Sequence, residues 1–359
     1  MATSKTHYIY CDPHFMNNPY SHHTKLLKYT EEILSEKQLQ FISILRADGK
    51  RKQSALEIRF RMLKGVKLFL DFALHFKNFI ILVVRQEKIR IVVINLNADP
   101  IWLLGVVMIR KVLRLNFELS IRFIGTVDRW FFKISNRSLY FQILKPLLEE
   151  KDKFTAESSE YARLLSSHFQ RRVDYLPYPP IGVNSATDGR LQVDDNTKAR
   201  KALYIGTPRI DKGYLELPKI VERLVKNGWS CTIQGYVGKD GQMLETVEKL
   251  RKIQGVNLVE NPPSDEDIRQ FILATDIVLL PYSTTEYRYR NSAMNFNSLY
   301  LGKQTASYSS TTLYSTANAL NLAIDLEQLL REDSAMSFIS LKSSLNAVQA
   351  KANWVKFIT

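Results

Sequence analysis

Short apolar runs alternate with longer amphipathic segments along most of the chain. This alternation predicts parallel β-strands covered by helices. We expect strands in the first half over residues 7–12, 40–45, 79–84, 89–97, 119–127, near 152–158, and over 173–178. The segments between them are predicted to be helical, and 56–76 and 98–112 are the clearest examples.

The pattern breaks after Pro179 and Pro180, where residues 181–200 are polar, rich in turn formers and without periodicity. We interpret this stretch as a linker between domains. A second series follows, with strands predicted over 201–207, 229–236, 256–260, 275–282 and 304–309. Helices are predicted between these strands, and Ser264 and Asp267 have the spacing of a capping box.

Together the two series predict an α/β fold with two Rossmann-like domains whose parallel sheets face each other across a cleft. The first domain is predicted to span residues 1–180 and the second 201–340. We expect residues 341–359, which include Trp354, to form a helix that returns to the first domain. The carboxyl ends of the strands are then the places to search for a ligand site.

The stretch YIGTPRIDKG ends the first strand of the second series and precedes a helix. Arg209 and Lys212 are two cations at this strand end, beside a helix N-terminus. An arginine binds a phosphate as a fork and a lysine binds it as a point charge, so the pattern indicates a phosphate or diphosphate site. The alternative is a solvated turn with two ordinary surface charges.

The stretch YSTTEYRYRNSAMNF follows another buried strand and contains neither glycine nor proline. Ser292 is a suitable N-cap for a helix that begins near Ala293, and the free N–H groups of such a helix favour an anion. Arg290 adds charge, and Glu286 can accept hydrogen bonds from sugar hydroxyls. The alternative is a polar helix cap whose neighbouring tyrosines serve only in packing.

These stretches, with NPPSDEDIRQFILATDIVLLPYS and LYLGKQTASYS, resemble the donor-binding domain of GT-B glycosyltransferases. The similarity is to the family-4-like group, which includes polysaccharide enzymes with a YRNSG-type element, some of them mannosyltransferases. It covers residues 200–315 well and the first half only by pattern. The resemblance implies that Arg209 and Lys212 bind the nucleotide diphosphate. The chain departs from the family at Asn297, where the family often has a glutamate that holds the ribose.

The donor site implied by this resemblance contains Gly206, Arg209, Lys212, Gly235, Tyr282, Glu286, Arg290, Asn291, Ser292, Ala293 and Asn297.

The first half is expected to bind the acceptor. PHFMNNPYSHHTKLL follows the first strand and resembles the NPY-type loop of the same polysaccharide group. The expected acceptor-binding residues are Asn17, Asn18, Tyr20 and Asn97. An inverting transfer needs a general base, for which Asp128 is the first candidate and His22 the second. Alternatively, Asp128 forms an ion pair with Arg129 or caps a helix.

The net charge of +14 and the pI of about 9.5 favour an anionic partner. Basic segments within 51–77 and 128–145 contain many apolar or aromatic residues, which suits either an anionic membrane surface or ordinary domain helices. Nucleic acid is a poorer fit because no recognition motif is present. The scattered histidines, and Asp194 and Asp195 in the linker, predict no metal site, and no cofactor is expected.

The expected function is glycosyl transfer from a nucleotide-diphosphate sugar to a glycan or lipid-linked oligosaccharide, as in polysaccharide synthesis. Three alternatives remain open: a non-catalytic protein that binds nucleotide sugars, a sugar-nucleotide epimerase of the same fold, and a basic surface-binding module without affinity for the donor. Two cysteines and no apolar run of membrane-spanning length predict a cytoplasmic protein, peripheral on the inner face of the membrane if the basic segments bind lipid.

Overall fold

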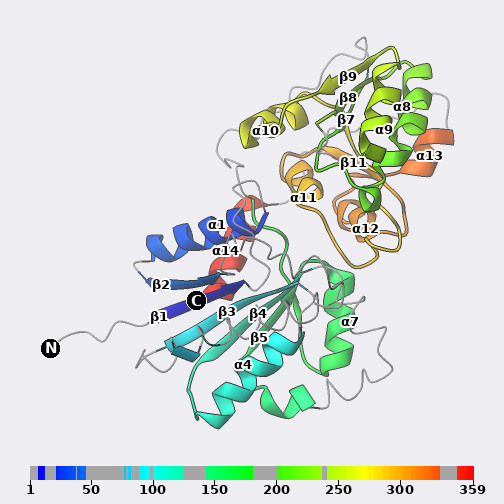
Figure 1. Ribbon diagram of the computed structural model, residues 1–359. Helices are drawn as coiled ribbons and strands as arrows, with labels where there is room; N and C mark the ends of the chain where they lie inside the picture. The colour runs from blue at the N-terminus through cyan, green and yellow to red at the C-terminus, as the bar shows by residue number, and fades with distance from the viewer. Residues whose placement is uncertain are drawn as a thin grey trace, which may run out of the picture. The chain divides into compact units, whose positions relative to one another are not determined.

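The computed structural model describes residues 7–12, 22–37, 39–45, 77, 80–81, 89–97, 100–124, 143–180, 200–236, 241–331 and 346–359. The chain divides into two compact units, Met1–Leu176 with Asn353–Thr359, and Pro177–Ala352. Each unit is a parallel sheet covered by helices (Figure 1). In the part of the chain that the structure describes, no helix is long and apolar enough to cross a membrane.

The first unit contains a six-stranded parallel sheet in the order β2-β1-β3-β4-β5-β6. Its strands are β1 (His7–Asp12), β2 (Gln40–Leu45), β3 (Ile89–Asn97), β4 (Glu118–Ile124), β5 (Lys153–Ala156) and β6 (Asp174–Tyr175). Its helices include α1 (His22–Glu36), α4 (Pro100–Val112) and α7 (Ser159–Phe169), and a 3-10 turn spans Lys145–Leu147. Ser158 caps α7 by accepting a hydrogen bond from the Tyr161 N–H at 3.2 Å.

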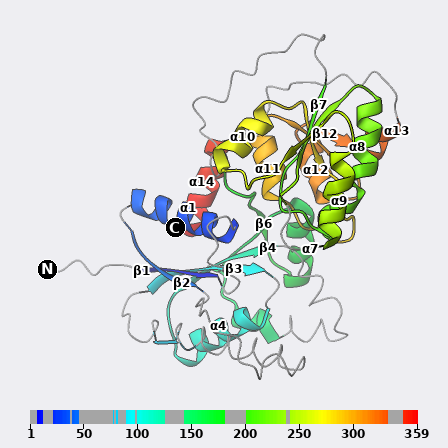
Figure 2. The ribbon, with the colours of Figure 1, turned by 45° about the horizontal axis from the view of Figure 1, so that its top comes forward.

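The C-terminal helix α14 (Ala347–Ile358) contributes to the core of this first unit. Trp354 is fully buried with Leu26 and Ile33 of α1, and its ring packs edge-on against Tyr29 at 6.2 Å. Figures 1 and 2 show α1 and α14 together on one face of the sheet and α4 on the other. A large aromatic residue at the end of the chain therefore helps to hold the first sheet.

The second unit also contains a six-stranded parallel sheet, in the order β12-β11-β10-β7-β8-β9. The strands are β7 (Lys201–Tyr204), β8 (Ser230–Gln234), β9 (Val256–Val259), β10 (Ile277–Leu280), β11 (Gln304–Ser307) and β12 (Ala323–Asp325). The helices are α8 (Leu217–Lys226), α9 (Gly241–Arg251), α10 (Asp265–Leu273), α11 (Ala293–Tyr300), α12 (Thr312–Asn318) and α13 (Leu326–Arg331).

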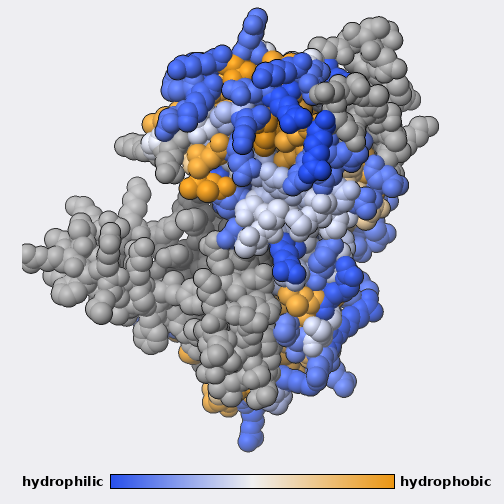
Figure 3. All heavy atoms as spheres, turned by 90° about the vertical axis from the view of Figure 1, so that its right-hand side faces the viewer, coloured by the Kyte–Doolittle hydropathy of each residue, from blue (hydrophilic) through white to orange (hydrophobic). Residues whose placement is uncertain are grey.

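In this unit α8, α9 and α13 lie on one face of the sheet and α10 and α11 on the other (Figure 1). The apolar stripe of α8, with Leu217, Ile220, Val221 and Leu224 buried, explains how that helix attaches to the sheet. The outward side of α8, α9 and α13 is mainly hydrophilic, as Figure 3 shows from the right-hand side of Figure 1.

The structure tests several of the predicted elements. The strands predicted over 7–12, 40–45 and 89–97 are confirmed as β1, β2 and β3, and the capping box of Ser264 and Asp267 is present. The strand predicted over 79–84 is wrong at the two residues that are described, because Ile80 and Ile81 are helical. A short apolar run suits a buried helix as well as a buried strand, and periodicity does not separate the two. The helix predicted over 56–76 and the linker at 181–199 lie outside the described residues.

The order of strands in the second unit reverses direction at β7. The chain runs from β7 to β8 and β9 on one side, and then returns to place β10 on the other side. In open parallel sheets, ligands bind outside the carboxyl ends of the strands at such a switch point. The loops that follow β7 and β10 are therefore the first place to look for a site.

These two loops pack directly against each other. Gly213, after β7, has φ +68°, and a Cβ added there would lie 1.9 Å from the carbonyl oxygen of Pro281, after β10. The Ser283 N–H also donates a hydrogen bond to the carbonyl of Asp211 at 3.0 Å. Only glycine satisfies both the backbone conformation and the close approach at position 213.

The contact between the two loops predicts a large loss of stability for Gly213→Ala. We expect about 2–4 kcal/mol, which combines left-handed strain with a forced backbone shift. Gly228→Ala is the matched control, because Gly228 has φ +81° but open space around its Cβ position, so only about 1 kcal/mol should be lost. Urea unfolding of both variants measures the difference. Equal losses would show that the close approach of the two loops contributes nothing to the free energy of unfolding.

Candidate functional site

The candidate site lies at the carboxyl ends of β7 and β10. Gly206 follows β7 with φ +147°, and its N–H donates to the side-chain carbonyl of Gln234 at 3.0 Å. A Cβ added to Gly206 would lie 3.6 Å from Lys212 Nζ and 3.8 Å from the hydroxyl of Tyr282. The ammonium and the hydroxyl therefore converge on one point beside the Gly206 backbone.

Lys212 supplies a sequestered cation at this point. Its Nζ lies over the ring of Tyr282, 5.6 Å from the ring centroid, and has no ion pair or hydrogen bond with any residue that the structure describes. Burial lowers the pKa of Lys212 to about 8, and the nearby charges of Arg209 and Arg290 act in the same direction. Burying a cation without a counter-ion is unfavourable, so this side chain is well suited to an anionic ligand.

Arg209 and Arg290 share a carboxylate. Arg209 Nε donates to Asp211 Oδ1 at 2.8 Å, and its Nη2 donates to Oδ2 of the same carboxylate. Arg290 Nη1 lies 3.7 Å from Asp211 Oδ2, and its guanidinium lies 5.1 Å from the ring centroid of Tyr287. Burial alone would raise the pKa of Asp211, but the hydrogen bonds from Arg209 and the surrounding positive charges outweigh burial and lower it.

Tyr282 places a buried hydroxyl beside Lys212. The side chain is fully buried and its ring packs against Tyr287 at 4.6 Å. Its hydroxyl makes no well-formed hydrogen bond among the described residues, and the Ser292 side chain lies near enough to lower its pKa against the effect of burial. Burial raises the pKa of this hydroxyl well above its usual value, so the group stays protonated and can donate a hydrogen bond.

Helix α11 begins beside this cluster. Ser292 caps it by accepting a hydrogen bond from the Met294 N–H at 3.3 Å. Asn291 holds the cap, because its Oδ1 accepts from the Ser292 N–H at 2.8 Å and from the Asn295 side chain at 3.0 Å. The first turn of α11, which begins at Ala293, carries the partial positive charge of a helix N-terminus.

The structure places the remaining predicted donor residues as follows. Gly235 is packed against Leu258, whose Cβ would lie 3.3 Å from an added Cβ, so close packing accounts for the glycine. Glu286 lies in the turn before Tyr287, and its N–H donates to the Ser283 hydroxyl at 3.4 Å. Asn297 lies on α11, and its Oδ1 is buried without a hydrogen-bond partner among the described residues.

The predicted acceptor and catalytic residues cannot be placed in the same way. Asn17, Asn18, Tyr20 and Asp128 lie outside the described residues. His22 begins α1 and Asn97 ends β3, but only their backbone positions are described. Their roles remain predictions.

Sequence reasoning missed two residues of the cluster, Asp211 and Gln234. Asp211 stands inside RIDK, but an aspartate between two cations in a loop gives no sign of which cation it binds. Gln234 ends β8 and holds the Gly206 N–H from the neighbouring strand, and Tyr214 donates to the Gln234 carbonyl at 2.7 Å. Such cross-strand contacts are visible only once the strand order is known.

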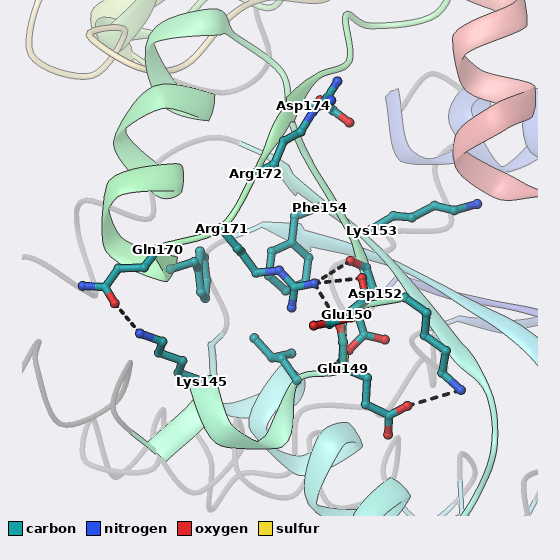
Figure 4. Close-up of a pocket in the computed structure, with 13 residues that line it drawn as sticks. Lys145, Glu149, Glu150, Asp152, Lys153, Phe154, Gln170, Arg171, Arg172 and Asp174 are labelled. Carbon is teal, nitrogen blue, oxygen red and sulfur yellow. Dashed lines mark hydrogen bonds and ion pairs between the residues drawn. The ribbon is translucent and has the colours of Figure 1, made fainter.

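A hollow of about 570 Å³ lies elsewhere, in the first unit (Figure 4). It is at the amino ends of β5 and β6, the edge opposite to the carboxyl ends. Several of its charged groups have partners within the protein: Arg171 donates to the backbone carbonyls of Glu149 and Asp152 at 2.9 and 3.1 Å, and Lys151 pairs with the Glu149 carboxylate at 3.2 Å. We therefore do not assign the candidate site to this hollow. Among the described residues, no group of histidine, cysteine or carboxylate side chains could hold a metal ion.

Comparison with known proteins agrees with this architecture. No family model matches the chain, and no curated protein matches it in sequence. Among solved structures, an α,α-trehalose-phosphate synthase (UDP-forming) from Burkholderia vietnamiensis superposes with a TM-score of 0.61 and 8% identity, covering 99% of this chain and 96% of that one. A lipopolysaccharide outer core galactosyltransferase, WaaB, gives a TM-score of 0.56 and 15% identity over 85% of this chain and 81% of that one.

A third similar structure is the UDP-GlcNAc 2-epimerase from Neisseria meningitidis bound to UDP-GlcNAc, with a TM-score of 0.52 and 11% identity over 91% of this chain and 89% of that one. At these identities the likeness concerns the fold. The α/β class with two parallel, Rossmann-like sheets is confirmed, and it is the GT-B fold that the sequence predicted.

Proposed function

We propose that the protein is a glycosyltransferase that takes a sugar from a nucleoside-diphosphate sugar. The observation that carries this proposal is the cluster at the switch point of the second sheet. Lys212, Tyr282 and the start of α11 present donors there, beside Arg209 and Arg290. Forked arginines, a point-charge lysine and a helix N-terminus are the groups that bind a diphosphate.

The same groups suit the chemistry of transfer. When the bond between the sugar and the diphosphate breaks, negative charge develops on the leaving diphosphate. Donors fixed in a partly dry site stabilise that charge more than they stabilise the intact donor. We therefore propose that Arg209, Lys212 and α11 supply this stabilisation in place of a metal ion. The solved structures with the same fold include proteins described as a galactosyltransferase and a UDP-forming synthase, which supports this assignment.

The acceptor is proposed to be a glycan or a lipid-linked oligosaccharide, bound by the first unit. This assignment rests on the resemblance of residues 13–33 to the NPY-type loop and on the net charge of +14. The basic segments that would meet an anionic membrane lie mostly outside the described residues.

A non-catalytic nucleotide-sugar-binding protein is the second candidate. Asn297 favours it, because an amide stands on α11 where the family often has a carboxylate. Incubating the protein with a panel of nucleotide sugars and glycan acceptors separates the two candidates. Binding with release of the nucleoside diphosphate supports the transferase, and binding without turnover supports the alternative. Interconversion of the donor sugar without an acceptor would indicate an epimerase.

The proposed diphosphate site leads to a prediction for donor affinity. Arg209→Ala and Lys212→Ala should each weaken binding of the donor by about 10- to 150-fold, because a charge-assisted contact contributes about 1.5–3 kcal/mol. Calorimetry with the best-binding nucleotide sugar measures the effect. Arg251→Ala and Lys249→Ala are matched controls, since both side chains are exposed and form ion pairs on α9. Normal donor binding by both site variants would show that the diphosphate does not bind at these residues.

A further prediction concerns the pH dependence of affinity for the nucleoside diphosphate. Because the free protein has a Lys212 pKa of about 8, raising the pH through this value removes the ammonium charge that a diphosphate needs. A bound diphosphate favours the charged form, so binding above this pH takes up a proton. Between about pH 7.5 and 9, affinity for the nucleoside diphosphate should fall about 5- to 10-fold.

Lys212→Met provides the control for this pH dependence. Its affinity should be low throughout and should lack the fall near pH 8, because no group with that pKa remains at position 212. Calorimetry in two buffers of different ionisation enthalpy measures the proton uptake directly. An unchanged pH profile in Lys212→Met would assign the titration to another group.

Another prediction concerns the general base of an inverting transfer. Asp128→Asn keeps the shape of the side chain and removes the proton acceptor, so turnover should fall by about 100- to 10,000-fold. Donor affinity should stay nearly unchanged, because the proposed donor site belongs to the second unit. Near-normal turnover would shift the role to His22. Retention of the anomeric configuration in the product would remove the need for this base.

A further inference from the structure

The cluster contains a carboxylate at a place where the proposed function requires only positive charge. Asp211 accepts two hydrogen bonds from Arg209 and lies 3.7 Å from Arg290. Its side chain is 24% exposed, and those of Arg209 and Arg290 are 41% and 27% exposed. The carboxylate therefore binds both guanidinium groups in a partly sheltered setting, where ion pairs are screened less than on the open surface.

The backbone holds Asp211 firmly in this position. Its carbonyl accepts a hydrogen bond from the Ser283 N–H at 3.0 Å, which ties the loop after β7 to the loop after β10. The neighbouring Gly213 fits closely against Pro281 in the same contact. The carboxylate is thus presented to the arginines by a rigid part of the fold.

The geometry of the ion pair is that of a forked arginine binding a two-oxygen anion. Nε and Nη2 of Arg209 point at the two oxygens of Asp211, which is also how an arginine binds two oxygens of a phosphate. A diphosphate at the switch point would seek the same donors. One edge of a guanidinium cannot serve both anions fully, so the two compete.

We propose that Asp211 is an internal counter-anion of the diphosphate site: in the free protein its carboxylate holds Arg209 and Arg290, and an incoming diphosphate displaces it from them. This inference rests on the proposed diphosphate site and adds to it a residue that sets the affinity. Lys212, which has no such partner, remains available from the start. In this scheme the diphosphate meets Lys212, Tyr282 and α11 before it takes over the arginines.

The counter-anion stabilises the protein when no ligand is bound. Without it, Lys212, Arg209 and Arg290 would repel one another with no compensating charge, which disfavours the folded state. Asp211 also raises the affinity of Lys212 for its proton, against the opposite effects of burial, Arg209 and Arg290. The carboxylate therefore weakens the bound state and stabilises the free one.

Asp211→Asn tests the proposal, since the amide keeps the size of the side chain and removes its charge. The probe is inorganic pyrophosphate, with UDP and GDP as further probes, and binding is measured by calorimetry near pH 6.5, where Lys212 is charged. We expect the variant to bind pyrophosphate about 5- to 30-fold more tightly than the unchanged protein. Without ligand, the variant should unfold at a lower temperature, and pyrophosphate should raise its Tm by more than it raises that of the unchanged protein.

Two controls separate competition for Arg209 from a general change of charge. Asp276→Asn removes the same charge at the amino end of β10, the opposite edge of the same sheet, and should leave pyrophosphate affinity within about 2-fold. In an Arg209→Ala background, Asp211→Asn should gain less than about 3-fold, because the principal partner of the carboxylate is absent.

The outcomes distinguish a counter-anion from a residue that positions the arginines, and both from the absence of a diphosphate site. A gain in Asp211→Asn that shrinks in the Arg209→Ala background supports the counter-anion. Equal gains in both backgrounds, or a loss of affinity, overturn it while leaving the diphosphate site in place, and a loss would make Asp211 a residue that positions the arginines. If neither the unchanged protein nor Asp211→Asn binds pyrophosphate, UDP or GDP, the proposed donor site and the counter-anion both fail.

Discussion

The contact between the loops after β7 and β10 is the constraint on which the candidate site depends. Gly213 allows the backbone to reach within van der Waals distance of Pro281, and the hydrogen bond from Ser283 to Asp211 closes the same junction. Because the two strands are neighbours at the switch point, this junction lies where such sheets generally bind their ligands. Every charged side chain of the cluster extends from one of these two loops or from the short turn that follows.

The junction also explains the unusual electrostatics. It places the partly buried Lys212 beside the fully buried Tyr282, so that less water solvates the ammonium and the hydroxyl. Desolvation then lowers the pKa of Lys212 to about 8 and raises that of Tyr282. Groups whose pKa values are displaced by burial and by specific charges cluster at functional sites, which agrees with the proposed role of these residues.

Much of this arrangement follows from the sequence, and the reasons for success and failure are physical. Arg209, Lys212 and the cap at Ser292 were predictable, because strand ends and helix starts have local signatures. Asp211 and Gln234 were not, since their partners depend on which strands are neighbours. The strand predicted at 79–84 was wrong at Ile80 and Ile81, because a short apolar run has no period that distinguishes strand from helix. The sequence predicted that the helix carrying Trp354 returns to the first domain, but its packing partners on α1 are long-range contacts that only the fold specifies.

The charge balance of the cluster bears on how the site would assist the proposed reaction. Three cations and one carboxylate, Asp211, leave a net charge of +2, to which the start of α11 adds a partial positive charge. A nucleoside-diphosphate sugar carries two negative charges on its diphosphate, and the released nucleoside diphosphate carries close to three. A site with this balance interacts more strongly with the diphosphate as the glycosidic bond breaks than with the intact donor. For the proposed reaction, that difference is the condition for catalysis by binding energy, and the side chains of this cluster would contribute to it.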